Sequence, residues 1–233
     1  MQRINTERCF ILHTRAYRET SLLLELFTEN YGRIGAIAKG VRKAKATGRG
    51  LLQPFVPLFI GCSGRGELLT LTDYESAGAP LLLIGRRVVC AFYVNELLVR
   101  LLHRFDPHPE LFQSYQTVLT NLEKTEQEQV VLRLFEKSLL QTLGYELQLQ
   151  KEVETGGALD PEAFYRFDPE KGPILVASNN LGIKNQIYPG NCFLALAEEK
   201  LNTAAILRDV KRLMRQALAH YLGDKPLESG KLL

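Results

Sequence analysis

Between residues 8 and 75, hydrophobic and polar positions alternate or form short apolar runs bounded by turn residues. Five such segments, rich in strand-forming residues, predict five short β-strands: RCFILHTRAY (8–17), SLLLELFTEN (21–30), GRIGAIAKG (32–40), PFVPLFIG (54–61) and ELLTLTDYE (67–75). Turns at 30–32 and 61–66 join the second strand to the third and the fourth to the fifth. A long connection separates the third strand from the fourth. This pattern is typical of a Greek-key barrel of the OB type, although an SH3-like barrel fits it equally well.

After Gly78-Ala79-Pro80 the pattern changes to helical spacing. Four segments predict helices: RVVCAFYVNELLVRLLHRF (87–105), PELFQSYQTVLTNLE (109–123), EQEQVVLRLFEKSLLQTLGY (126–145) and TAAILRDVKRLMRQALAHYLG (203–223). Between the last two, residues 146–191 combine turn dipeptides with buried-type aromatics, which indicates a small inserted module. We therefore expect an α+β, multi-domain protein, with an OB-fold β-barrel domain at 1–79 and a mainly helical domain at 80–233.

The composition is that of an ordinary globular protein, with 45% hydrophobic and 24% charged residues. No apolar run approaches the length of about 18 residues that a membrane span needs, and the N-terminal MQRINTERCF carries charge where a signal peptide has its apolar core. We expect a cytoplasmic protein with no membrane partner.

Charge is distributed unevenly. The net charge is only +3, but residues 30–66 hold seven cations and no acid, so this stretch contributes +7 and the rest of the chain −4. Five of the cations lie in AKGVRKAKATGRG (38–50), together with three glycines that let the backbone approach a phosphate strand closely. Such a loop is either a solvated face or the contact with a polyanion.

The candidate nucleic-acid contacts are cations from several parts of the barrel and from the last helix. The barrel contributes Arg15, Arg18, Arg33, Lys39, Arg42, Lys43, Lys45, Arg49 and Arg65. Tyr17, Tyr31 and Phe55 lie at strand ends where an OB face could stack bases, although burial in the core suits Phe55 better. On the last helix Lys211, Arg212 and Arg215 share one face, which fits an amphipathic helix or an additional phosphate contact.

Motifs for catalysis and metal binding are absent from the sequence. It contains no G-x-x-x-x-G-K-[ST], H-E-x-x-H or G-x-S-x-G motif, and its four cysteines, which we expect to be buried hydrophobes, form no C-x-x-C pair. We therefore predict no enzymatic activity, no cofactor and no metal.

The residues also carry a family resemblance. FILHTRAYRETSLLLELFTENYGRIGAIAKGVRK with LLQPFVPLFI resembles the N-terminal barrel of the bacterial RecO recombination-mediator family, and YVNELLVRLL, RLFEKSLLQTLGY and LMRQALAHYLGDKPLESGKLL resemble successive blocks of its helical portion. The resemblance implies a DNA repair and recombination mediator that binds single- and double-stranded DNA, anneals complementary strands, works with RecR and single-stranded DNA-binding protein to load RecA, and associates with the nucleoid. A non-catalytic protein-interaction scaffold with an incidental basic patch is the alternative.

Two further expectations depend on this resemblance. Many family members hold a structural zinc with two C-x-x-C pairs after the LGY block, whereas here only Cys192 lies in the corresponding region, so we expect the module to fold without metal. For the C-terminal tail of single-stranded DNA-binding protein, which is acidic and hydrophobic, Arg133 and Lys137 beside Leu134 offer a site. A helix that merely carries two cations on its polar face explains the same residues.

Overall fold

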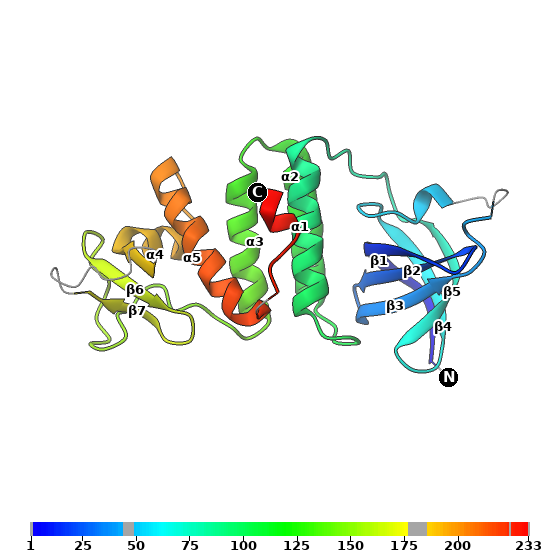
Figure 1. Cartoon of the computed structure of the whole chain (residues 1–233), viewed down its shortest axis with the longest axis horizontal. Helices are drawn as coiled ribbons and strands as arrows, with labels where there is room; N and C mark the ends of the chain where they lie inside the picture. The colour runs from blue at the N-terminus through cyan, green and yellow to red at the C-terminus, as the bar shows by residue number, and fades with distance from the viewer. Residues whose placement is uncertain (1, 44–48, 177–185, 224, 233) are drawn as a thin grey trace. The chain divides into compact units, whose positions relative to one another are not determined.

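The computed structural model describes residues 2–43, 49–176, 186–223 and 225–232 (Figure 1). By its internal contacts the chain forms two compact units: unit 1 comprises Met1–Thr125 and Leu227–Leu233, and unit 2 comprises Glu126–Pro226. No helix among the described residues is long and apolar enough to cross a membrane.

Unit 1 begins with a closed five-stranded barrel. Its strands are β1 (Gln2–Tyr17), β2 (Ser21–Thr28), β3 (Gly32–Ala38), β4 (Leu58–Gly64) and β5 (Leu68–Ser76). They follow the order β1-β2-β3-β5-β4, and every pair is antiparallel except β3 with β5. This Greek-key order confirms the predicted OB-fold over the SH3-like alternative.

The barrel interior is filled by alternate aliphatic residues of all five strands, among them Ile11, Leu26 and Ile34, which have no exposed surface. The cysteines of the barrel, Cys9 and Cys62, lie in the same core. All four cysteines are buried, as predicted, and burial raises the pKa of the Cys62 thiol to about 12. They therefore act as small hydrophobic side chains.

Two helices of unit 1, α1 (Arg86–Leu101) and α2 (Pro109–Lys124), cover part of the barrel's outer surface. Phe10 of β1 and Phe27 of β2 point outward and meet Phe112 and Tyr115 of α2, with ring centroids 5.2 Å apart for Phe10 and Tyr115 and 5.4 Å apart for Phe27 and Phe112. Edge-to-face contacts of this kind stabilise an interface beyond the area they bury. The aromatic cluster therefore fixes α2 against the barrel.

The last residues of the chain return to unit 1. The carboxylate of Glu96 on α1 accepts hydrogen bonds from the backbone N–H groups of Glu228 and Ser229, at the start of a 3-10 turn, η3 (Ser229–Leu232). Burial opposes ionisation of Glu96, but the bonds from Ser229 and Glu228 lower its pKa overall. Glu96 thus anchors the C-terminal segment.

Unit 2 combines helices with a small sheet. Its elements are α3 (Glu128–Thr142), β6 (Phe164–Asp168), β7 (Gly172–Leu175), β8 (Ile187–Pro189), α4 (Gly190–Ala197) and α5 (Ala204–Leu222). The sheet has the order β7-β6-β8, and Tyr165 and Tyr188 on its inner face pack edge-on against Phe193 of α4. Short strands and turns in residues 146–191 were expected, whereas α4 and β8 were not.

The boundary between the compact units lies elsewhere than the predicted domain boundary at 79/80. Helix α2 packs on the barrel through the aromatic cluster, and α1 is joined to it by the hydrogen bond from Asn95 to the Leu12 carbonyl, so both helices belong with the barrel in unit 1 and unit 2 begins only at Glu126.

We predict that Asn95→Ala destabilises unit 1. The buried Asn95 amide donates to the Leu12 carbonyl at 2.9 Å and accepts from the Tyr115 hydroxyl at 2.7 Å, so its loss leaves two buried polar groups unpaired. We expect a loss of about 1–3 kcal/mol in the free energy of unfolding, measured by urea denaturation. Gln113→Ala, at an exposed position of α2, is the matched control, and equal midpoints for the two variants would contradict the prediction.

Candidate nucleic-acid interface

The outer face of the barrel between β1, β2 and β3 is organised by strand pairing. Arg15 lies opposite Leu23, and Leu23 lies opposite Ile37, so these three side chains form one row across the sheet. Two residues further along β1, Tyr17 lies opposite Ser21 at the β1–β2 turn. The row and the β1–β2 turn lie at the same end of the barrel, where β3 also ends.

Two segments that are distant in the sequence converge at this end. The backbone N–H of Arg42 donates to the Thr20 carbonyl at 2.9 Å, and Arg42 Nη1 donates to the Arg18 carbonyl at 3.1 Å. These bonds fasten the start of the connection after β3 to the β1–β2 turn. Gly40, with φ of +73°, makes the bend that this approach requires.

We call the resulting group of cations the basic edge: Arg15, Arg18, Lys39, Arg42 and Lys43. Arg42 is half-buried and the other four are exposed. Among the described residues, the side chains of Arg15, Lys39 and Lys43 form no ion pair, so their charge faces solvent. Glu19 is the acid within the turn itself.

Of the three aromatic residues expected to stack bases, Tyr17 alone keeps that arrangement. Its ring is partly exposed, and the Arg18 guanidinium lies 5.3 Å from the ring centroid. Tyr31 packs against the barrel core. Phe55 is buried and meets Phe92 edge-on, which agrees with the interpretation that Phe55 is a core residue.

Arg33 does not belong to the basic edge. Its Nε donates to the Leu102 carbonyl at 3.0 Å and its Nη1 pairs with Glu25 at 2.9 Å, with 15% of the side chain exposed. The structure thus corrects the expectation that Arg33 extends the track: it fastens β2 and β3 to the segment after α1.

The remaining predicted contacts divide by location. Arg65 is exposed in the β4–β5 turn, which in OB-folds flanks the same face as the β1–β2 turn. Lys45 and the side chain of Arg49 lie outside the described residues. On α5, Arg215 is exposed and Lys211 is half-buried, whereas Arg212 pairs with Asp209 at 3.1 Å and lies 4.9 Å from the Tyr188 ring centroid. Arg212 therefore contributes to packing within unit 2.

The predicted partner site on α3 is not presented to solvent. Arg133 is 2% exposed and pairs with Glu136 at 2.7 Å, while Lys137 donates to the Ala197 carbonyl and to Glu199. Leu134 is half-buried. The expectation of an exposed Arg133 and Lys137 is corrected, because both cations are used by contacts within the fold.

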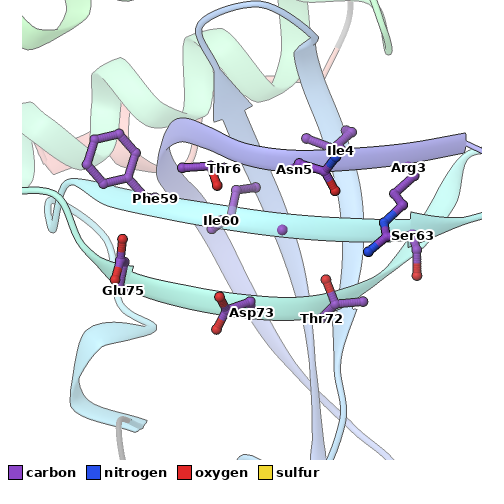
Figure 2. Close-up of a pocket in the computed structure, with 11 residues that line it drawn as sticks. Arg3, Ile4, Asn5, Thr6, Phe59, Ile60, Ser63, Thr72, Asp73 and Glu75 are labelled. Atoms are coloured by element: carbon purple, nitrogen blue, oxygen red, sulfur yellow. The ribbon is translucent and has the colours of Figure 1, made fainter.

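Two hollows are lined by described residues of the barrel. One, of about 340 Å³, lies over β1, β4 and β5 (Figure 2). Asp73 and Glu75 of β5 line it together with polar side chains of β1, and Arg3 is its single cation, so it does not suit a polyanion. The second, of about 460 Å³, is lined by His13 and Arg15 of β1, Leu23 of β2, Leu68 of β5, and Val99 and Arg104 of the α1 region.

This second hollow was not predicted from sequence. Neighbouring residues of a strand point to opposite faces. Because Leu24 of β2 is buried in the core, the sequence could have indicated that Leu23 places an apolar side chain on the outer face. The approach of Val99 and Arg104 depends on tertiary packing and left no local signal.

Within unit 2, a carboxylate organises the predicted metal-free module. Glu152 accepts hydrogen bonds from the N–H groups of Glu154 and Thr155, from the Thr155 hydroxyl, and from the N–H of Leu175 in β7. These bonds lower the pKa of Glu152 to about 2. The described residues contain no group of three or more His, Cys, Asp or Glu side chains placed to hold a metal ion. That the module folds without metal remains a prediction.

A closed OB barrel with a basic edge beside its β1–β2 turn defines an OB-fold protein of the class whose open face binds oligonucleotides or oligosaccharides. The comparisons narrow this class. The family models described as Recombination protein O N terminal and Recombination protein O C terminal match residues 1–79 and 85–231. The chain therefore belongs to the RecO family.

Relatives cover nearly the whole chain. DNA repair protein RecO of Nitrosococcus oceani is 46% identical over 99% of this chain and 93% of its own length, and that of Coxiella burnetii is 43% identical over 100% and 99%. One solved structure, an Entamoeba histolytica asparaginyl-tRNA synthetase, aligns with a TM-score of 0.26 and 11% identity over 76% of this chain and 41% of its own, too low to support any inference.

We predict a pH-dependent effect of Glu152→Gln. The folded-state pKa of Glu152 lies below that of an ordinary carboxyl, so the stabilisation it gives is fully present above the unfolded-state pKa and is lost as pH falls toward about 2. The variant should lower the melting temperature at pH 7, and the difference from wild type should shrink between pH 5 and pH 3. Glu154→Gln, at an exposed neighbour, controls for the charge change; a difference independent of pH would refute the assignment.

Proposed function

We propose that this RecO-family protein binds single- and double-stranded DNA through the sugar-phosphate backbone, with the basic edge and Arg65 as the main contacts. The observation that carries the proposal is the convergence of the β1–β2 turn with the segment after β3, fixed by the hydrogen bonds of Arg42 to Thr20 and Arg18. Cations from both segments thereby face one region of an OB barrel. Lys45, Arg49, Lys211 and Arg215 are secondary candidates.

Binding of this kind draws its free energy from the release of counterions condensed on DNA, so it is largely independent of base sequence and weakens steeply with salt. Neutralising the phosphates of two strands also reduces the repulsion between them. The protein would therefore promote annealing of complementary strands without ATP, and we propose that it has no enzymatic activity and requires no cofactor.

The family resemblance extends the proposal to partners. We infer that the protein acts with RecR and with the C-terminal tail of single-stranded DNA-binding protein to help load RecA, and that DNA binding places it at the nucleoid in the cytoplasm. Because Arg133 and Lys137 are engaged within unit 2, these two cations are not retained as the tail-binding site.

The test is a salt titration of fluorescent oligonucleotide binding. Replacing Lys39, Arg42 and Lys43 with Ala should flatten the slope of log K against log salt by up to about three units, because each cation that contacts a phosphate contributes close to one. A Lys39→Ala/Lys43→Ala pair, which keeps the Arg42 hydrogen bonds, should give about two-thirds of the effect.

The matched control replaces three exposed cations of unit 2, Lys151, Lys171 and Lys225, with Ala and should keep the wild-type slope. Equal slopes for all variants would remove the basic edge from the proposal. No binding by the wild-type protein at low salt would favour the scaffold alternative.

A further inference from the structure

The hollow beside the basic edge has an apolar wall and an arginine that spans it. Leu23 of β2, Leu68 of β5 and Val99 of α1 supply the wall, and Leu68 is 47% exposed. This leucine lies at the start of a strand, and its contact with water contributes no favourable free energy. Its position makes it available to an apolar or aromatic ligand.

Gly35 leaves room for the Arg104 side chain, which lines this hollow. It pairs with Glu25 on one side and Leu68 on the other, in the row next to that of Arg15 and Leu23. A Cβ at Gly35 would lie 2.6 Å from Arg104 Nη1, so the absence of a side chain lets the guanidinium lie across β3. Any larger residue would push Arg104 away.

The hollow carries charges of opposite sign on its two sides. Arg104 and Arg33 both pair with the single carboxylate of Glu25, which balances one of their two charges. Arg15 stands on the β1 side, next to Arg18 and the rest of the basic edge, while Glu67 stands on the β5 side. A phosphate is attracted to the first side and repelled by the second.

One hydrogen-bond donor in the hollow has no acceptor. Arg104 Nη1 is buried without a hydrogen-bond partner among the described residues, a situation that costs free energy. This atom is covered by protein atoms, so a ligand in the hollow would reach it only after a shift of the Arg104 side chain. What the hollow presents to a ligand is therefore its apolar wall, with the basic edge beside it.

We propose that this hollow receives one unpaired nucleobase of a bound single strand, with the phosphodiester chain held outside it on the basic edge. The inference rests on the proposed DNA binding and adds a strand preference to it. A base in a duplex is stacked and paired and cannot enter, whereas a base of a single strand can turn inward against Leu23, Leu68 and Val99. Tyr17, two residues beyond Arg15 on the same face, then stacks the neighbouring base.

The experiment compares three probes on the full chain at one salt concentration: a fluorescent oligothymidylate, an abasic oligonucleotide with the same number of phosphates, and a duplex of equal length. Wild-type protein should bind the oligothymidylate at least about tenfold more tightly than the abasic strand, since stacking of one base on an aromatic ring such as Tyr17 is worth about 1–3 kcal/mol and 1.4 kcal/mol is tenfold. Leu68→Ser should reduce this difference by the contribution of the base in the hollow, while leaving the stacking on Tyr17, the duplex affinity and the salt slope unchanged.

Leu82→Ser is the control, because Leu82 is also a highly exposed leucine of unit 1 but does not line the hollow. It should keep the tenfold difference. Duplex affinity reports whether Leu68→Ser remains folded, and Leu68→Met, which keeps an apolar wall, should restore the preference.

The outcomes separate the two proposals. Equal wild-type affinity for thymidylate and abasic strands, with a steep salt slope, would overturn the base pocket and leave backbone binding intact. A difference as large in Leu68→Ser as in wild type would also overturn it. Absence of binding to all three probes would overturn the proposed function itself.

Discussion

The barrel depends on one strand that pairs with two partners in succession. Residues 2–9 of β1 pair with β4 and residues 9–17 pair with β2, and Cys9 is the crossing point, opposite Leu58 on one side and Thr28 on the other. This double pairing, together with the parallel contact of β3 with β5, closes the sheet. The double pairing also determines which part of the outer surface is covered. Phe10, next to the crossing point, lies under α2. Arg15 and Tyr17 lie farther along the strand, where the side chains reach solvent.

The covering helices divide the cations of unit 1 into two groups. Arg33 and Arg104 converge on Glu25 under the segment that follows α1, and in doing so they hold that segment to β2 and β3. Such partly buried pairs fix geometry and add little to the field outside the protein. Arg15, Arg18, Lys39 and Lys43 are exposed, so solvent and a polyanion can reach them. The surface from which positive charge acts on a ligand is thus smaller than a count of charges along the sequence suggests. It lies beside the open face of the barrel.

The sequence was most informative where a local pattern determines the structure. Alternation and short apolar runs bounded by turn residues predicted all five barrel strands, and the glycines after α3 and α5 marked helix ends, with φ of +81° at Gly144 and +70° at Gly223. The first strand begins earlier than predicted, at Gln2, because its polar N-terminal half is held by pairing with β4 and not by its own periodicity. Strand β8 was missed for a similar reason: three residues carry no detectable period, and their pairing with β6 supplies the stability.

For the candidate site, the sequence indicated residue types and not their availability. A cation on a helix looks the same in sequence whether its side chain is solvated or buried. Arg133 is 2% exposed and pairs with Glu136 on the same helix. Arg212 was likewise placed correctly on its helix, but the aromatic ring beneath it comes from β8, which the sequence did not predict. Contacts that depend on the meeting of two distant elements cannot be read from either element alone.

The two proposed modes of DNA contact differ in what they require of the strand. Cations on the basic edge hold phosphates in any strand, because the backbone has the same charge in single-stranded and duplex DNA. A base turned into the hollow against Leu68 and Val99, in contrast, is withdrawn from pairing, so it must leave before a complement can close over that nucleotide. Release of the base from the hollow loses the free energy of one base contact. Each new base pair gains the free energy of stacking and of hydrogen bonds with the second strand. A pocket for one base on an otherwise sequence-independent surface therefore holds a single strand in place without preventing it from pairing, which is the balance that an annealing protein needs.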